Sequence, residues 1–215
     1  MSLNSIKSFV SSHESKLGIT EGRTRIIAVS KLQPNERVEL VLKSGHRIFG
    51  ENRVQEAHAK WPKFKQNFKN IELHLLGPLQ RNKVRDAVEL FDFIHTIDNI
   101  KLAQRISLIT KETGRCPKLF IQVNTGMEPQ KAGVAVNDLE NLLTICSELC
   151  LPVVGLMCIP PVLEDPNPHF EALRTLKEKY SLSELSMGMS NDFEKAILAG
   201  ASYIRVGSAI FGQRP

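Results

Sequence analysis

The hydrophobic positions of this chain follow two alternating periods. Short runs rich in β-branched and other apolar residues recur along the sequence, and helical patterns of apolar residues separate them. The runs predict eight strands, at residues 25–30, 47–49, 72–76, 93–96, 119–124, 153–159, 184–187 and 203–206. The intervening stretches predict helices at residues 35–43, 52–60, 82–89, 101–112, 139–149, 168–179 and 192–199.

This strand–helix alternation favours an α/β fold of the (β/α)8 TIM-barrel type. Alternating units make right-handed crossovers into a parallel sheet, and eight of them are the number that closes it. An open doubly wound sheet is the alternative. The chain stops a few residues after the last predicted strand, so we expect no helix there and expect the helix at residues 3–17 to fill the gap. With 215 residues and no Ser/Gly/Pro-rich linker, one domain over residues 1–215 is expected.

The composition indicates which class of ligand and which cellular compartment to expect. The formal charge of +5 is spread along the chain, which favours anionic small molecules without requiring nucleic acid. The four cysteines form no CxxC pair, and the first residues lack the apolar core of a signal peptide. No apolar run approaches the roughly 18 to 20 residues of a membrane span. We therefore expect a cytoplasmic protein with no metal and no membrane association.

The candidate chemistry begins at Lys31, which ends the apolar run of the first predicted strand. Partial desolvation lowers the pKa of an ammonium group and leaves the amine that an aldehyde needs to form an imine. A lysine that turns into solvent where a strand ends is the plainer reading of this segment alone. Barrel active sites form at the C-terminal ends of the strands. Several residues would share that rim with Lys31: Asn52, Gly77, Asn124, Met157 and Ser190.

Two loops carry signals for phosphate. Gly188 allows close backbone approach, and Ser190 stands where the next helix is expected to begin, although an ordinary serine N-cap would look the same. After the last strand, Arg205, Gly207 and Ser208 offer a cation, backbone amides and a hydroxyl. Arg205 would point into the barrel mouth, because neighbouring strand residues alternate faces. Phosphate loops together with an imine-forming lysine indicate a phosphorylated aldehyde, of which pyridoxal 5'-phosphate (PLP) is the commonest cofactor.

Several ordered segments also carry a family resemblance: AVSK, FGENRVQE, LLGPLQRNK, QVNTGMEPQKAG, GLMCIPP, LSMGMSNDFEKAI and IRVGSAIFGQR. In order and spacing they resemble the pyridoxal phosphate homeostasis proteins (the YggS/PROSC group), from about Arg25 to the C-terminus. The resemblance implies the barrel of the alanine racemase N-terminal domain and a role in vitamin B6 homeostasis. It also implies PLP held covalently on Lys31 as a Schiff base.

The resemblance assigns further residues to the cofactor. Ser190 and the Gly207–Ser208 turn match the family's phosphate-binding loops, and Arg205 matches an arginine beside the cofactor. The remaining matches line the same pocket: Asn52, Asn124, Met157 and Gly188. Three departures from the usual pattern are expected on the pocket's outer wall rather than at the phosphate: Leu73, Arg81 and Met127.

The same comparison argues for a carrier rather than an enzyme. Related racemases use a lysine together with a tyrosine from a second domain of a partner subunit, and this chain ends before such a domain. Its two tyrosines, Tyr180 and Tyr203, are predicted in a helix and at the wrong end of a strand. If Arg205 meets the pyridine nitrogen, as its equivalent does in the racemase-type fold, the ring is a poorer electron sink. A PLP-dependent amino acid racemase or related PLP enzyme is the alternative.

Two features stay outside the predicted site. Basic and aromatic residues interleave between Lys60 and Lys69, which could indicate single-stranded nucleic acid binding. We favour a solvated helix end and loop whose aromatic side chains dock on the barrel. The same exposed segment would also suit docking of PLP-dependent apoenzymes. We expect a monomer, with a dimer left open. His74 and His95 are left out of the site, because histidines inside strands are more often satisfied core residues.

Overall fold

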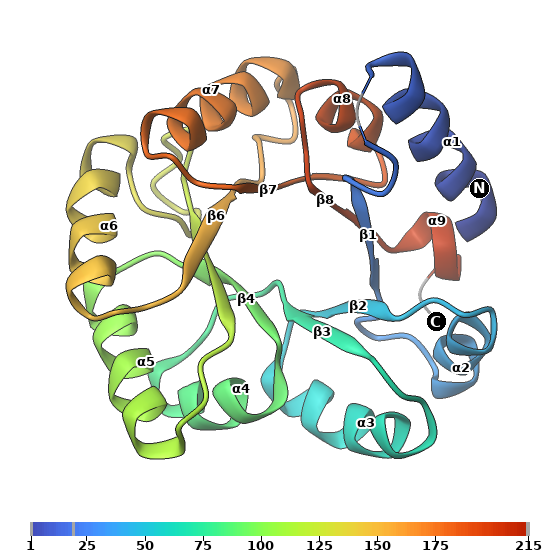
Figure 1. Cartoon of the computed structure of the whole chain (residues 1–215), viewed down its shortest axis with the longest axis horizontal. Coiled ribbons are helices and arrows are strands. Elements are labelled where there is room, and N and C mark those ends of the chain that lie inside the picture. The colour runs from blue at the N-terminus through green and yellow to red at the C-terminus, as the bar shows by residue number, and fades with distance from the viewer. Residues whose placement is uncertain (1, 19, 214–215) are drawn as a thin grey trace.

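Eight parallel strands close into a barrel in chain order, with β8 pairing back onto β1 (Figure 1). The computed structural model describes residues 2–18 and 20–213, so both ends of the predicted 1–215 domain lie outside the described residues, as does Arg214 of the last resemblance segment. The strands are β1 (Arg25–Val29), β2 (Ile48–Glu51), β3 (Glu72–Leu75), β4 (Phe93–Ile97), β5 (Lys118–Gln122), β6 (Val153–Met157), β7 (Glu184–Met189) and β8 (Tyr203–Val206). The (β/α)8 prediction is confirmed, and the open sheet is wrong.

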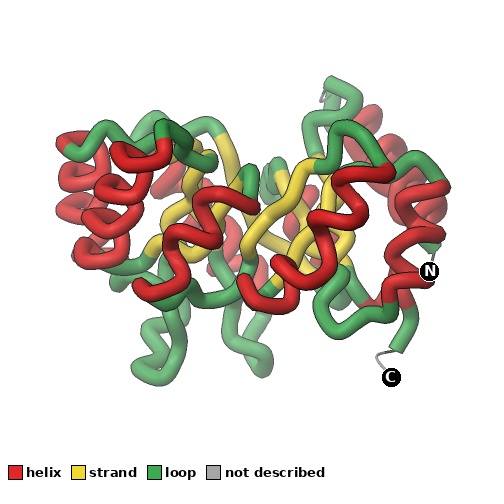
Figure 2. Tube along the Cα trace, turned by 90° about the horizontal axis from the view of Figure 1, so that it is seen from below, coloured by secondary structure: helices red, strands yellow, loops and turns green. Residues whose placement is uncertain are grey.

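The helices form a ring outside the barrel (Figures 1 and 2). They are α1 (Leu3–Lys16), α2 (Asn35–Lys43), α3 (Val54–Asn67), α4 (Val84–Leu90), α5 (Ile100–Thr113), α6 (Leu139–Glu148), α7 (Pro166–Lys179), α8 (Phe193–Leu198) and α9 (Ser208–Phe211). Two 3-10 turns, η1 (Arg81–Lys83) and η2 (Val136–Asp138), precede α4 and α6. Each of these helices is shorter or more polar than a bilayer-crossing segment must be, as far as the chain is described.

The last strand is followed by a helix, contrary to the sequence-based expectation. α9 is a single short turn after β8, and its Ile210 and Phe211 amides donate to the Gly207 carbonyl oxygen. α1 lies beside α8 and α9 in Figure 1, and the Phe9 ring meets the Phe193 ring edge-on at 5.6 Å between centroids. The N-terminal helix therefore does cover the gap in the helical ring, but it shares that place with α9.

Local capping explains where several helices begin and end. The Asn99 side chain accepts a hydrogen bond from the Leu102 amide and starts α5, while Gly114 ends it at φ 68°. α7 begins two residues earlier than predicted. Its N-cap is Asp165, and Pro166 suits the first helical position because that position needs no N–H donor.

α3 runs well past its predicted end at residue 60, straight through Pro62. Trp61 and Phe64 are buried, and Trp61 packs on Phe49 of β2 with 4.9 Å between ring centroids. This burial outweighs the hydrogen bond lost at an exposed proline. The aromatics therefore dock on the barrel as predicted. The exposed basic and aromatic patch proposed for nucleic acid or apoenzymes is wrong at Lys60 and Trp61, which are both buried.

Strand residues alternate between two cores. Ile26 and Ala28 of β1 pack outward under the helices, whereas Ile27 lies in a separate cluster inside the barrel. The interior cluster is apolar and aromatic, comprising Ile27, Leu76, Phe93, Phe120, Met157 and Tyr203. Polar residues at inward positions are consequently surrounded by rings and branched side chains.

Candidate functional site

Lys31 follows β1 at the rim where the strands end, and its side chain is half-buried. β1 and β8 are in register at Ala28 and Val206. The next residues along the two strands pack closely, because a Cβ placed on Gly207 would lie 3.3 Å from the Val29 carbonyl oxygen. Lys31 and the loop after β8 thus occupy adjoining parts of one rim.

The backbone on both sides of Lys31 is held by α3. Lys60 Nζ donates to the Ser30 carbonyl oxygen at 2.9 Å, and the Leu32 amide donates to Glu56 Oε1 at 2.6 Å. Lys60 and Glu56 are joined in turn at 3.0 Å. The strand end that carries Lys31 is therefore fixed by a helix rather than left as a mobile tip.

Glu51, the last residue of β2, anchors this arrangement. Its Oε1 accepts hydrogen bonds from Ser30 Oγ at 2.8 Å, Lys60 Nζ at 3.0 Å and Trp61 Nε1 at 3.0 Å. Its Oε2 is buried with no hydrogen-bond partner among the described residues. Burial raises the pKa of Glu51, and the nearby Lys60 opposes that shift. Sequence reasoning missed this support, although Glu51 belongs to the GEN segment and Lys60 to the basic stretch.

The two predicted phosphate loops meet. The Gly207 amide donates to Ser190 Oγ at 3.4 Å, which joins the loop after β7 to the loop after β8. Ser190 is half-buried, and Ser208 is exposed at the start of α9. Ser190 does not begin a helix as expected, because α8 starts three residues later at Phe193.

Gly188 has a steric reason to be glycine. Its φ is 87°, and a Cβ there would lie 2.5 Å from Ala196 Cβ and 3.0 Å from Phe193 Cα. The loop that carries Ser190 is therefore pressed against α8.

Arg205 points into the barrel, as its alternation with Val206 predicted. Its Nη1 donates to Ser186 Oγ and its Nη2 donates to the Cys158 carbonyl oxygen, both at 2.8 Å. Burial lowers the pKa of Arg205, but a guanidinium begins so far above neutrality that it stays charged. The site thus contains a permanent cation with two fixed neutral acceptors.

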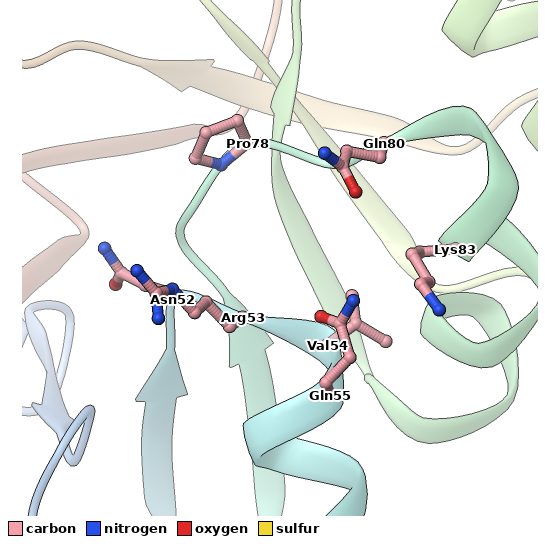
Figure 3. Close-up of a pocket in the computed structure, with 7 residues that line it drawn as sticks. All are labelled: Asn52, Arg53, Val54, Gln55, Pro78, Gln80 and Lys83. Carbon is pink, nitrogen blue, oxygen red and sulfur yellow. The ribbon is translucent and has the colours of Figure 1, made fainter.

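Asn52 lies after β2 and is half-buried. It borders a cavity of about 620 Å³ between the β2–α3 and β3–α4 connections (Figure 3). Two cations, Arg53 and Lys83, line the same cavity. Gly77 is packed against Asn52 so tightly that a Cβ would fall 2.1 Å from its carbonyl oxygen. Of the predicted cofactor residues, Asn52 alone borders this cavity.

Two further predicted cofactor residues, Met157 and Asn124, have their side chains packed or hydrogen-bonded within the protein. Met157 is fully buried in the barrel interior. The Asn124 side chain closes its own loop, donating to the Glu128 carbonyl oxygen at 2.9 Å and accepting from the Glu128 amide at 3.3 Å. Of the three departures from the family pattern, Leu73 lies in the core under the helices rather than on an outer pocket wall, while Arg81 and Met127 are exposed.

Comparison with known proteins gives the family. Residues 14–215 match the family model for the alanine racemase N-terminal domain. The pyridoxal phosphate homeostasis protein of Vibrio alginolyticus is 39% identical over 94% of this chain and 91% of its own length. This chain belongs to the pyridoxal phosphate homeostasis protein family. The family's protein from Aquifex aeolicus is 36% identical over 93% of this chain and 91% of its own length.

Solved structures of the family agree with the fold. PipY of Synechococcus elongatus PCC7942, in a structure with PLP bound, superposes with a TM-score of 0.83 at 39% identity over 94% of this chain and all of its own. An alanine racemase of Clostridium difficile superposes with a TM-score of 0.69 at 15% identity, covering 97% of this chain and 57% of its own, and shares the fold alone. No cluster of three His, Cys, Asp or Glu side chains able to hold a metal ion occurs in the described part of the chain.

Proposed function

We propose that this protein binds PLP as a Schiff base on Lys31, and that it holds and releases the cofactor without efficient turnover. PLP, when bound, supplies a reactive aldehyde and an anionic phosphate carried on one ring. The adjacency of the β1 and β8 ends carries the proposal. It supports a Lys31 amine close to the Ser190–Gly207 junction, where a hydroxyl and backbone amides suit phosphate. The PLP-bound structure of the Synechococcus relative supports the choice of ligand.

Arg205 is proposed to face the pyridine nitrogen. A guanidinium is always a donor, so a ring nitrogen that meets it accepts a hydrogen bond and stays unprotonated. A neutral pyridine withdraws electrons less strongly, and chemistry that needs a carbanion is disfavoured. The fixed contacts of Arg205 to Ser186 and the Cys158 carbonyl support a permanent positioning role for this cation.

The placement of the tyrosines also supports holding over racemisation. Tyr203 begins β8, at the opposite end of the barrel from Lys31, and burial raises the pKa of its phenol. Tyr180 follows the end of α7 and donates to Glu140 Oε2 at 3.2 Å. α7 leads into β7, so its C-terminal end lies near the starts of the strands. Neither phenol is offered to the Lys31 rim as a second base.

We further propose a cytosolic monomer whose partners are PLP and the apoenzymes that need it. The four cysteines are free, which suits a reducing compartment. The name of the bacterial relatives, homeostasis protein, fits a role in supply rather than turnover. Transfer to an apoenzyme can be followed as the activity that it gains when mixed with the PLP-loaded protein.

The first test is covalent capture of the cofactor. The protein is mixed with PLP, its absorbance spectrum is recorded, and borohydride reduction is followed by peptide mapping. We expect a Schiff-base band in the wild type and in Lys83→Ala, a control lysine on the neighbouring cavity, but not in Lys31→Ala. A pyridoxyl group mapped to another lysine would refute the assignment, and no band in the wild type would remove the cofactor.

The absence of turnover needs a separate measurement. The PLP-loaded protein is incubated in deuterated water with a series of L-amino acids, and the α-hydrogen is followed by NMR. We expect exchange no faster than with free PLP. Exchange that depends on Lys31 and exceeds the free cofactor would replace the carrier with the racemase-type alternative.

A further inference from the structure

Arg205 carries a buried positive charge without a direct counter-ion. It is 5% exposed, and both of its hydrogen-bond acceptors are neutral. None of the ion pairs among residues 2–18 and 20–213 involves this guanidinium. The charge of Asp192 favours the charged guanidinium from a distance. Burying a charge without a bonded counter-ion is costly, so fixed hydrogen bonds that hold it are expected.

A chain of buried hydrogen bonds leads away from Arg205 through the barrel interior. Ser186 Oγ, which accepts from Arg205, is 2.9 Å from His95 Nδ1. His95 Nε2 is 2.8 Å from His74 Nδ1, and His74 Nε2 is 2.8 Å from Glu72 Oε1. The chain thus joins the end of β8 to the start of β3, at the opposite end of the barrel.

The hydrogen-bond chain is fully buried along its middle. His74 and His95 are fully buried. The His74 ring stacks on Phe93 with 4.4 Å between centroids, and the His95 ring stacks on Phe120 at 4.2 Å. Both nitrogens of each imidazole make hydrogen bonds within this series of residues.

The charged ends give the chain one direction. Arg205 can only donate, so Ser186 Oγ accepts from it, and an ionised Glu72 can only accept, so His74 donates through Nε2. Burial lowers the pKa of both histidines and keeps them neutral. Neutral His74 then accepts at Nδ1 from His95 Nε2, and His95 accepts at Nδ1 from the Ser186 hydroxyl. Each donor in such a chain strengthens the next acceptor.

Glu72 is suited to the anionic end. Burial would raise the pKa of Glu72, but the His74 hydrogen bond and the charges of Arg25 and Lys118 bring it below the ordinary value. Glu72 and Lys118 also line a cavity of about 460 Å³ at the N-terminal end of the barrel. The carboxylate is therefore both ionised and partly hydrated.

We propose that Glu72, His74 and His95 are positioning residues for Arg205, forming a one-way hydrogen-bond chain that begins at the Glu72 carboxylate and makes Ser186 a fixed acceptor for Arg205. This deepens the proposed function and rests on it, because the held guanidinium is the group offered to the PLP ring. Loss of Glu72 lets both histidines reverse their tautomers, so Ser186 loses its acceptor at His95 and its bond to Arg205 weakens.

The test begins on the protein without PLP. Tautomers of His74 and His95 are assigned by ¹⁵N NMR, using the signals lost in His74→Gln and His95→Gln, and rotation of the Arg205 guanidinium is measured in the same samples. We expect both wild-type histidines to carry the proton on Nε2. Glu72→Leu should move it to Nδ1 and speed the rotation, while Glu72→Gln, whose amide oxygen still accepts, should restore the wild-type tautomers.

PLP affinity is the second readout. Glu72→Leu should weaken binding roughly three- to tenfold. Glu184→Leu should leave binding unchanged, since that carboxylate pairs with Arg23 and Arg25 at the same barrel end but touches neither histidine. Two results would refute the proposal. One is a proton on Nδ1 of His74 and His95 in the wild type, and the other is a Glu72→Leu variant whose tautomers, guanidinium rotation or PLP affinity match those of the wild type. A wild type that binds no PLP would defeat the proposed function, while the tautomers and the rotation would still judge the chain.

Discussion

The rim of the barrel and its interior use polar residues in opposite ways. At the rim, Ser190 and Gly207 are half-buried and joined by one long contact of 3.4 Å, and Ser208 is exposed. Inside, the links from Glu72 to Arg205 are 2.8 to 2.9 Å long and their histidines are fully buried. The interior polar groups are thus already paired, whereas the rim groups keep hydrogen-bonding capacity for the proposed ligand. Changes to the paired interior should therefore reduce stability and reach PLP affinity only through Arg205, whereas loss of a rim hydroxyl should change affinity and leave stability nearly unchanged.

The largest loss of stability is expected at the buried Lys60–Glu51 ion pair, which supports the rim. Lys60→Met removes the cation beside Glu51 and leaves a carboxylate buried without its partner. Breaking such a pair costs about 3–5 kcal/mol of unfolding free energy. Urea unfolding, followed by the fluorescence of Trp61, the single tryptophan of the chain, measures the loss.

Two control variants show whether that loss comes from the buried ion pair. Lys63→Met, on the same helix but exposed, should change stability little. Adding Glu51→Gln to Lys60→Met removes the stranded charge and should recover part of the loss. If Lys60→Met destabilised the protein no more than Lys63→Met, the rim would not depend on this buried pair.

The second-largest loss of unfolding free energy is expected on lowering the pH, and it involves His46, which precedes β2 at the N-terminal end of the barrel strands. Burial, aided by the charge of Lys7, lowers the pKa of His46 from 6.5 to about 4. Between these pH values His46 is protonated in the unfolded chain but stays neutral in the folded protein. The His46 contribution is thus complete above about pH 6.5 and falls as the pH drops, by roughly 3 kcal/mol in all.

Unfolding free energies at pH 7, 6 and 5 check this prediction. His46→Gln should remove part of the slope, whereas His58→Gln, at an exposed position, should keep it. His74 and His95, whose pKa values are also lowered by burial, should contribute in the same direction. A His46→Gln slope equal to that of the wild type would contradict the assignment.

The rim could be predicted from sequence because position at a strand end is a local property. Lys31 closes an apolar run and Ser190 follows one, so the barrel hypothesis alone gathers them. The helix boundary at Ser190 failed because α8 begins only where Phe193 starts to pack against the barrel.

The interior hydrogen-bond chain has a partial signal in the sequence. Glu72 and His74 share one strand face, and Tyr203 and Arg205 share another, so period-2 alternation already places polar groups inward. Which of them meet depends on how strands far apart in sequence are placed in the barrel, as for His95 with Ser186. For the same reason local rules ended α3 too early, since Pro62 is a local signal and the burial of Trp61 is tertiary.

Gly188→Ala tests how firmly the rim loop rests on the framework. The new Cβ would meet Ala196 Cβ and Phe193 Cα at a φ of 87°, so we expect a loss of about 1–3 kcal/mol in unfolding free energy and weaker PLP binding. Gly114→Ala, at φ 68° with open space around it, should cost only about 1 kcal/mol of backbone strain. Equal costs at the two glycines would mean that α8 does not brace the Ser190 loop.

Ser190→Ala should give the smallest change in stability and the cleanest separation of the two regions. The hydroxyl is half-buried and the hydrogen bond that it accepts from the Gly207 amide is a long one, so the unfolding free energy should shift by no more than about 0.5 kcal/mol. A hydroxyl that donates to phosphate is worth about 1 kcal/mol, so the PLP dissociation constant should rise roughly two- to tenfold. Ser12→Ala, exposed on α1, should alter neither quantity. A Ser190→Ala protein that lost stability yet bound PLP like the wild type would make this serine part of the framework, and the contrast between rim and interior would fail at the residue where it is most easily measured.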